Sequence, residues 1–81
     1  MNDLSKFEQA TIQVDAKQLK CPMPLLKLKQ ALNAISLEQS VHLIATDRTS
    51  LRDIKSFIDV SKHSMTTSDQ ETEIHFYVVK G

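Results

Sequence analysis

Apolar residues repeat at helical spacing in two stretches of the chain. The first stretch carries Leu25, Leu28, Ala31, Leu32 and Ile35. Such a stripe marks one face of a helix that packs against a core. Pro24 fits the first turn of this helix, because the N–H that proline lacks would have no helical partner there. We therefore expect a helix that begins near Pro24.

The second helical stretch runs from about Ser50 to Val60. Its apolar positions again lie on one face, at Leu51, Ile54, Phe57 and Ile58. Ser50 and Asp53 have the spacing of a capping motif, with Asp53 in place of the usual Glu or Gln. This pair indicates a cap at the start of the second helix.

Four shorter stretches have the alternation or composition of β-strands. They cover residues 11–15, 41–46, 64–69 and 73–80. In the first stretch Ile12 and Val14 share one face, and the second is largely apolar. The third is polar and predicts an edge strand. The fourth is rich in aromatic and β-branched residues, the strongest strand signal in the chain, and residues 69–72 would supply the turn before it.

The order strand–helix–strand–helix–strand–strand predicts an α+β fold, a βαβαββ two-layer sandwich. Strands separated by helices are expected to run parallel, and the last two should form an antiparallel hairpin. The result is a four-stranded mixed sheet with two helices on one face and the other face exposed or available to a partner. We expect residues 1–9 to be a flexible N-terminal segment and residues 10–81 to form a single domain.

Charge and hydropathy restrict the possible partners. Ten basic and ten acidic residues give the 81-residue chain a formal net charge of zero. A protein that binds nucleic acid directly is expected to be basic, so we expect no such partner. No apolar run approaches the roughly 20 residues that span a bilayer, and the first residues lack the apolar centre of a signal peptide. The sequence predicts a soluble cytoplasmic protein with no membrane partner.

The single cysteine, Cys21, stands in a Cys-Pro-Met-Pro segment that holds both prolines, Pro22 and Pro24. A residue before proline is pushed out of the helical region, so Cys21 is expected just before the first helix. A helix start favours negative charge, and we expect the pKa of the thiol to fall from about 8.5 to roughly 7–8. Cys21 is then either a positioned nucleophile or a small buried hydrophobe, the usual state of a free cysteine.

The segment "VDAKQLKCPMPLLKLKQALNAI", followed by "LIATDRTSLRDIKSFI", resembles the TusA/SirA-like sulfur-carrier family. The matching positions are Asp15, Leu19, Cys21, Pro22, Pro24, Asp47, Arg52, Asp53 and Ile54. The resemblance covers about residues 12–80 and implies the same βαβαββ fold. Gln18 stands where the family usually has glycine, and "SLEQS" replaces a Pro-Gly-type turn. Since glycine often marks positive φ, we expect Gln18 to force a different backbone before Cys21.

The resemblance implies that Cys21 accepts sulfur as a persulfide from a cysteine desulfurase or another donor and passes it to an acceptor protein. In the best-known members the destination is 2-thiouridine in tRNA, and other members serve sulfur oxidation or molybdenum-cofactor supply. The chain has no second cysteine, so the other sulfur of any exchange must come from a partner. Such a protein is a carrier rather than a classical enzyme.

The resemblance also suggests roles for other residues near Cys21. Pro22, Pro24 and Asp15 would position the loop. Candidate docking residues for the partners are Lys17, Lys20, Lys27, Asp47, Arg52 and Asp53, with Lys29 in the same basic cluster. Simpler alternatives are that Asp15 ends a strand, that Asp47 caps a turn, and that Arg52 and Asp53 are exposed helix positions involved in capping.

The histidines give no sign of a metal site. His42, His63 and His75 have no metal-like spacing with Cys21, so we expect no metal and no cofactor. His42 and His75 fall in expected strands, where solvent-facing packing is the ordinary explanation. Two other functions stay open, a regulatory or redox interaction module and an RNA-binding domain. The neutral charge and the few aromatic residues argue against the RNA-binding domain.

Overall fold

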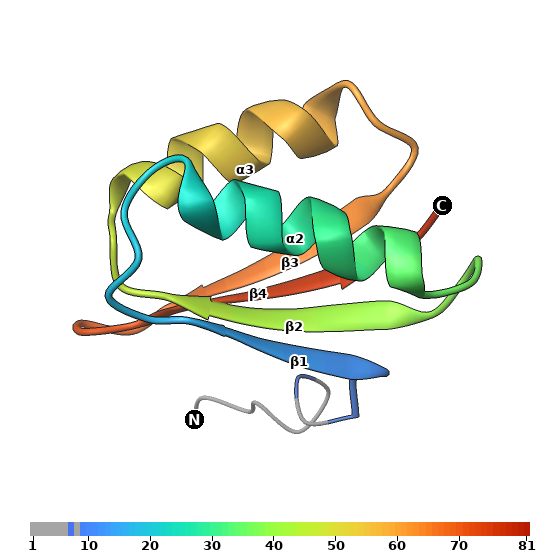
Figure 1. Ribbon diagram of the computed structural model, residues 1–81, viewed down its shortest axis with the longest axis horizontal. Helices are drawn as coiled ribbons and strands as arrows, with labels where there is room; N and C mark the ends of the chain where they lie inside the picture. Colours follow the sequence, from blue (N-terminus) through green and yellow to red (C-terminus); the bar gives the residue numbers. More distant parts are fainter. Residues whose placement is uncertain (1–6, 8) are drawn as a thin grey trace.

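Two helices lie on one face of a four-stranded mixed sheet (Figure 1). The structure is a computed structural model and describes residue 7 and residues 9–81. Its elements are β1 (Ile12–Ala16), α2 (Met23–Ala34), β2 (Ser40–Ala45), α3 (Thr49–Asp59), β3 (Ser64–Asp69) and β4 (Ile74–Val79). Neither of these helices, within the described residues, is long and apolar enough to span a membrane.

The sheet has the strand order β1-β2-β4-β3. β1 and β2 run parallel, and β4 is antiparallel to both of its neighbours, β2 and β3. This arrangement confirms the predicted α+β, βαβαββ sandwich. β3 lies at an edge, as its polar sequence predicts, since an edge strand buries little of either face.

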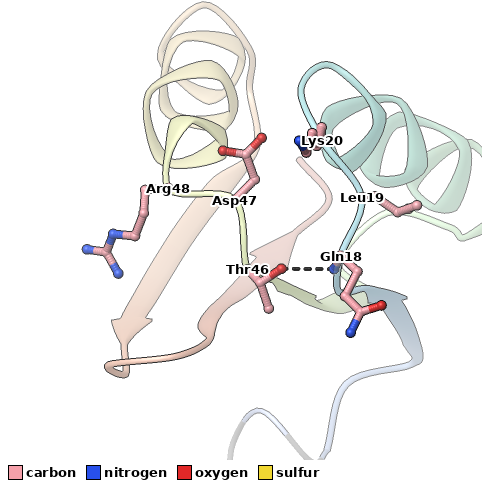
Figure 2. Close-up of a pocket in the computed structure, with 6 residues that line it drawn as sticks. All are labelled: Gln18, Leu19, Lys20, Thr46, Asp47 and Arg48. Carbon is pink, nitrogen blue, oxygen red and sulfur yellow. Dashed lines mark hydrogen bonds between the residues drawn. The ribbon is translucent and has the colours of Figure 1, made fainter.

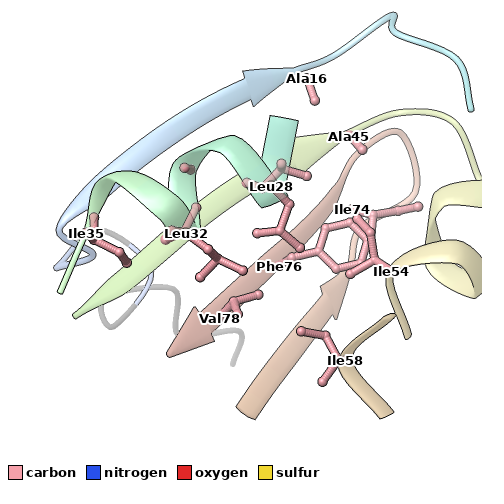
Figure 3. Packing of buried hydrophobic residues seen from close by; sticks show 13 residues of the cluster. Ala16, Leu28, Leu32, Ile35, Ala45, Ile54, Ile58, Ile74, Phe76 and Val78 are labelled. Atoms are coloured by element: carbon pink, nitrogen blue, oxygen red, sulfur yellow. The ribbon is translucent and has the colours of Figure 1, made fainter. Parts of the chain in front are cut away.

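The hydrophobic core lies between the sheet and the helices. Successive strand residues point to opposite faces, so alternate positions of β2 and β4 face the helices. These buried positions are Val41, Leu43, Ala45, Ile74, Phe76 and Val78. Figure 3 shows Leu28 of α2 and Ile54 of α3 packed close to the ring of Phe76. The helical stripes read from the sequence are therefore the faces that pack on the sheet.

The start of α3 differs from the capping motif expected at Ser50 and Asp53. The Asp47 Oδ1 atom accepts the Thr49 N–H at 3.0 Å and the Thr49 hydroxyl at 2.8 Å. Ser50 is buried, and its hydroxyl donates to the Asp47 carbonyl oxygen. The carboxylate of Asp47, two residues before Thr49, already accepts an N–H of the first turn. The expected cap at Ser50 and Asp53 is therefore wrong.

The sheet face opposite the helices is not simply open to solvent. His42 of β2 and His75 of β4 are both buried there, and their rings stack with centroids 5.0 Å apart. His42 Nε2 and His75 Nδ1 lie 2.8 Å apart, and His75 Nε2 lies 3.2 Å from Glu73 Oε1. The expectation of solvent-facing histidines is therefore wrong, because each ring is held by a neighbouring polar group and covered from above.

Phe7 provides much of that cover. Its side chain is 3% exposed and meets the rings of His42, His75 and Tyr77 edge-on, at centroid distances of 5.3, 6.1 and 5.8 Å. Edge-to-face contacts of this kind add to the free energy of burying an aromatic ring. The flexible segment expected at residues 1–9 falls mostly outside the described residues, but Phe7 is buried within it.

Replacing Phe7 by alanine should expose the histidine pair and lower the free energy of unfolding by about 2–4 kcal/mol. Urea unfolding followed by circular dichroism measures the change. Val60→Ala is the matched control, because Val60 is 86% exposed and should change stability by less than about 0.5 kcal/mol. A Phe7→Ala chain as stable as the control would contradict the packing described here.

Candidate functional site

Cys21 lies in the loop that joins β1 to α2 and is exposed. Pro22 occupies the N-cap position of α2, and Pro24 stands in its first turn. The Met23 N–H donates to the Lys20 carbonyl at 2.8 Å, which closes a turn around Cys21. The position expected for Cys21, outside the helix and just before its start, is confirmed. Its exposure excludes the buried-hydrophobe alternative.

Asp47 ties the Cys21 loop to the start of α3. Its Oδ2 atom accepts the Cys21 backbone N–H at 2.9 Å, while Oδ1 takes the two Thr49 donors. These hydrogen bonds hold the pKa of the Asp47 carboxyl below its ordinary value, first through the Cys21 N–H and then through Thr49, with a further contribution from the charge of Lys20. Asp47 thus caps a turn, the simpler alternative given above, and it also binds the Cys-Pro loop.

Asp53 of α3 faces the thiol itself. The Cys21 Sγ–H donates to Asp53 Oδ2. This hydrogen bond raises the pKa of the Cys21 thiol, with smaller contributions from desolvation and from the charges of Asp53 and Asp47. The positive charge of Arg52 opposes the shift. A nearby carboxylate disfavours a second negative charge, and it outweighs the weak attraction of the helix start. The lowered thiol pKa expected from the sequence is therefore wrong.

Gln18 adopts the left-handed backbone region itself, with φ of 66°. Its N–H donates to the Thr46 hydroxyl oxygen at 2.8 Å, which fastens the loop to the residue that follows β2 (Figure 2). Glu38, in the turn written "SLEQS", has a similar φ of 69°. The expectation that Gln18 forces a different backbone is wrong, because the chain accepts the left-handed conformation without a glycine.

An open cleft of about 490 Å³ lies beside this loop, between the segments that follow β1 and β2 (Figure 2). Its lining residues are Gln18, Leu19, Lys20, Thr46, Asp47 and Arg48. The Arg48 guanidinium makes two hydrogen bonds with the Asp69 carboxylate, at 2.8 and 2.6 Å. This ion pair keeps the pKa of Asp69 below its ordinary value and ties the start of α3 to the end of β3.

The predicted docking residues separate into two groups. Lys20, Arg52, Asp47 and Asp53 all interact with the Cys21 loop through charge or hydrogen bonds. The other two, Lys17 and Lys27, lie outside this group. Asp15, which was expected to position the loop, stands one residue before the end of β1 and accepts the Lys17 N–H at 3.0 Å. Lys27 is half-buried on α2, and the Lys29 ammonium lies 5.1 Å from the ring centroid of Phe57.

Two exposed apolar residues near Cys21 were not predicted as part of the site from the sequence. Met23 is 40% exposed and Leu26 is 42% exposed, both in the first turn of α2. They lie off the stripe that packs into the core, so their exposure was readable from the helical spacing. The contacts of Thr46 and Asp53 with the Cys21 loop had no such signal, because each joins residues far apart in the sequence.

The fold and the exposed thiol together define a class of protein, a small two-layer domain that presents a cysteine at the start of its first long helix. The sequence profile of the family described as sulfurtransferase TusA matches residues 12–80. The sulfur carrier protein TusA of Allochromatium vinosum is 36% identical over 78 residues, which cover 95% of this chain and 99% of that protein. The chain belongs to the TusA sulfurtransferase family.

A solved structure agrees at the level of the fold. The crystal structure of the SirA-like protein from Desulfitobacterium hafniense superimposes with a TM-score of 0.69 at 20% identity. The match covers 88% of this chain and 99% of that one.

Replacing Gln18 by glycine should raise the free energy of unfolding by about 0.5–1 kcal/mol, because relief of the left-handed backbone exceeds the entropic cost of glycine. Glu38→Gly should act in the same direction. Leu37→Gly is the control, since Leu37 lacks a positive φ and should lose stability. Chemical denaturation measures all three, and equal losses in all three variants would contradict the role given to the backbone.

Proposed function

We propose that this chain is a sulfur-relay carrier that accepts a sulfur atom on Cys21 as a persulfide and passes it to an acceptor protein. The observation that carries the proposal is an exposed thiol, fixed by a Pro-x-Pro segment and two carboxylates, in a member of the TusA family. A cysteine desulfurase is the proposed donor. The relative from Allochromatium vinosum, named a sulfur carrier, supports the same role here.

The transfer balances without an external oxidant or reductant. Cys21 gives up its proton, and its thiolate attacks the outer sulfur of the donor persulfide. The donor's S–S bond breaks, and the donor leaves as a thiolate that takes a proton. The products are a Cys21 persulfide and a donor thiol. In delivery, a thiolate of the acceptor attacks the outer sulfur of the Cys21 persulfide, and Cys21 leaves as a thiolate that takes a proton. The partner supplies the second sulfur of each exchange, because Cys21 is the chain's single cysteine.

The surface around Cys21 suits transient docking of a partner protein. Met23 and Leu26 present apolar area beside the thiol, while Lys20 and Arg52 provide positive charge. Apolar contacts supply affinity, and the charges steer a partner with an acidic rim. Lys17 and Lys27 lie farther out, and we expect them to contribute to association rate more than to positioning.

The destination of the sulfur is a finer question. We propose tRNA 2-thiouridine synthesis as the pathway, with this chain acting in the cytoplasm through protein partners rather than by binding tRNA directly. A regulatory or redox interaction module is the second candidate. The raised thiol pKa favours the regulatory form of it, in which Cys21 does no chemistry, because a protonated thiol is a weaker nucleophile at neutral pH and is also harder to oxidise.

Incubation with a cysteine desulfurase and cysteine should add one sulfur atom, about 32 Da, to the intact chain. A reductant should remove it, because a persulfide S–S bond is reducible. Cys21→Ser should gain no mass. Lys62→Ala serves as a surface control and should load fully, because Lys62 is exposed in the segment between α3 and β3.

An unloaded chain whose Cys21 is still alkylated by iodoacetamide would contradict the relay proposal and favour the regulatory module. The alkylation control shows that the thiol is accessible, so a negative result cannot be assigned to a blocked or misfolded site.

A further inference from the structure

The contact between Cys21 and Asp53 depends on the chemical state of the sulfur. A thiol has a proton to donate, and here it donates that proton to Asp53 Oδ2. A persulfide is more acidic than the thiol from which it forms, so near neutral pH it is mostly an anion. An anion has no proton for Asp53 and is repelled by its charge. The same carboxylate therefore attracts one state of Cys21 and repels the other.

We propose that Asp53 is a positioning residue that holds the unloaded Cys21 thiol against α3 and turns the loaded persulfide outward towards the acceptor. The inference rests on the proposed sulfur-carrier function. Its consequence is a bias in the exchange equilibrium: Asp53 stabilises the thiol and destabilises the persulfide, so the carrier gives up its sulfur more readily than an isolated cysteine would.

The charges that act on Cys21 come from α3 and from the segment before it. Asp53 and Arg52 lie on α3, and Asp47 lies in the segment before α3. Lys20, in the same loop as Cys21, acts on Asp47. Asp47 is already occupied by the Cys21 N–H and the two Thr49 donors. Asp53 is the carboxylate that meets the sulfur atom directly. Asp53 is therefore the residue whose interaction changes most between the thiol and the persulfide, and the positive charge of Arg52 reduces the repulsion between Asp53 and the persulfide anion.

Sulfur exchange with glutathione persulfide measures this bias without any protein partner. Cys21 thiol and glutathione persulfide give Cys21 persulfide and glutathione, so one S–S bond breaks and one forms. The fraction of loaded chain at equilibrium, read by intact mass, gives the exchange constant. Asp53→Asn keeps the shape and an acceptor oxygen but removes the charge. It should increase the exchange constant about three- to tenfold.

Two further variants make the result specific. Asp53→Glu keeps the negative charge and should stay within about twofold of the wild type. Asp59→Asn removes one charge from the same helix at a residue paired with Lys55 at 3.2 Å, and it should leave the constant unchanged. Circular dichroism checks that each variant is folded. An Asp53→Asn constant equal to the wild-type value, or equal shifts in Asp53→Asn and Asp59→Asn, would overturn the inference.

This experiment separates the inference from the proposed function. If no desulfurase loads the chain but Asp53→Asn still raises the exchange constant, the relay proposal fails and the role of Asp53 stands. If the desulfurase loads the chain and the exchange constant does not respond to Asp53→Asn, the relay stands and the role of Asp53 fails.

Discussion

The parallel pairing of β1 with β2 is the constraint on which the site depends. Parallel strands end at the same edge of a sheet, and the register sets Ala16 of β1 beside Ala45 of β2. The two loops that follow these strands therefore leave the sheet side by side. Gln18 can then reach Thr46, and Cys21 can reach Asp47. The strand register thus places the two loops side by side, independently of the side chains near the sulfur.

The two carboxylates at Cys21 have different physical roles. Asp47 accepts backbone N–H groups from both the cysteine loop and the start of α3, which keeps it ionised and makes it a structural link. Asp53 faces the thiol and raises its pKa, so Cys21 holds its proton near neutral pH. An exposed cysteine on a helix start is usually easy to oxidise or alkylate. Here the Asp53 carboxylate moderates that reactivity.

Local pattern predicted the fold and the position of the cysteine, but not the contacts around it. The stripe through Leu28 and Leu32 predicted α2, the aromatic and β-branched composition of residues 73–80 predicted β4, and Pro22 placed Cys21 outside the helix. The contact with Asp53 joins α3 to a loop that is separated from it along the chain by both α2 and β2, and no spacing rule predicts such a pair. Gln18 was misjudged because a side-chain type does not determine φ when a hydrogen bond to Thr46 holds the backbone. The histidine pair was misjudged because the cover from Phe7 arises only in three dimensions.

The most direct test of this account is the pH dependence of Cys21 alkylation by iodoacetamide in the native chain and in the chain unfolded by urea. Cys21 is the single cysteine, so the intact mass reports one site. The unfolded chain should show a midpoint near the ordinary thiol pKa of about 8.5. The native chain should show a higher one, because Asp53 accepts the thiol proton. The folded state then binds the proton more tightly, so its stability should fall as the pH rises through this range. A native midpoint at or below that of the unfolded chain would contradict the account.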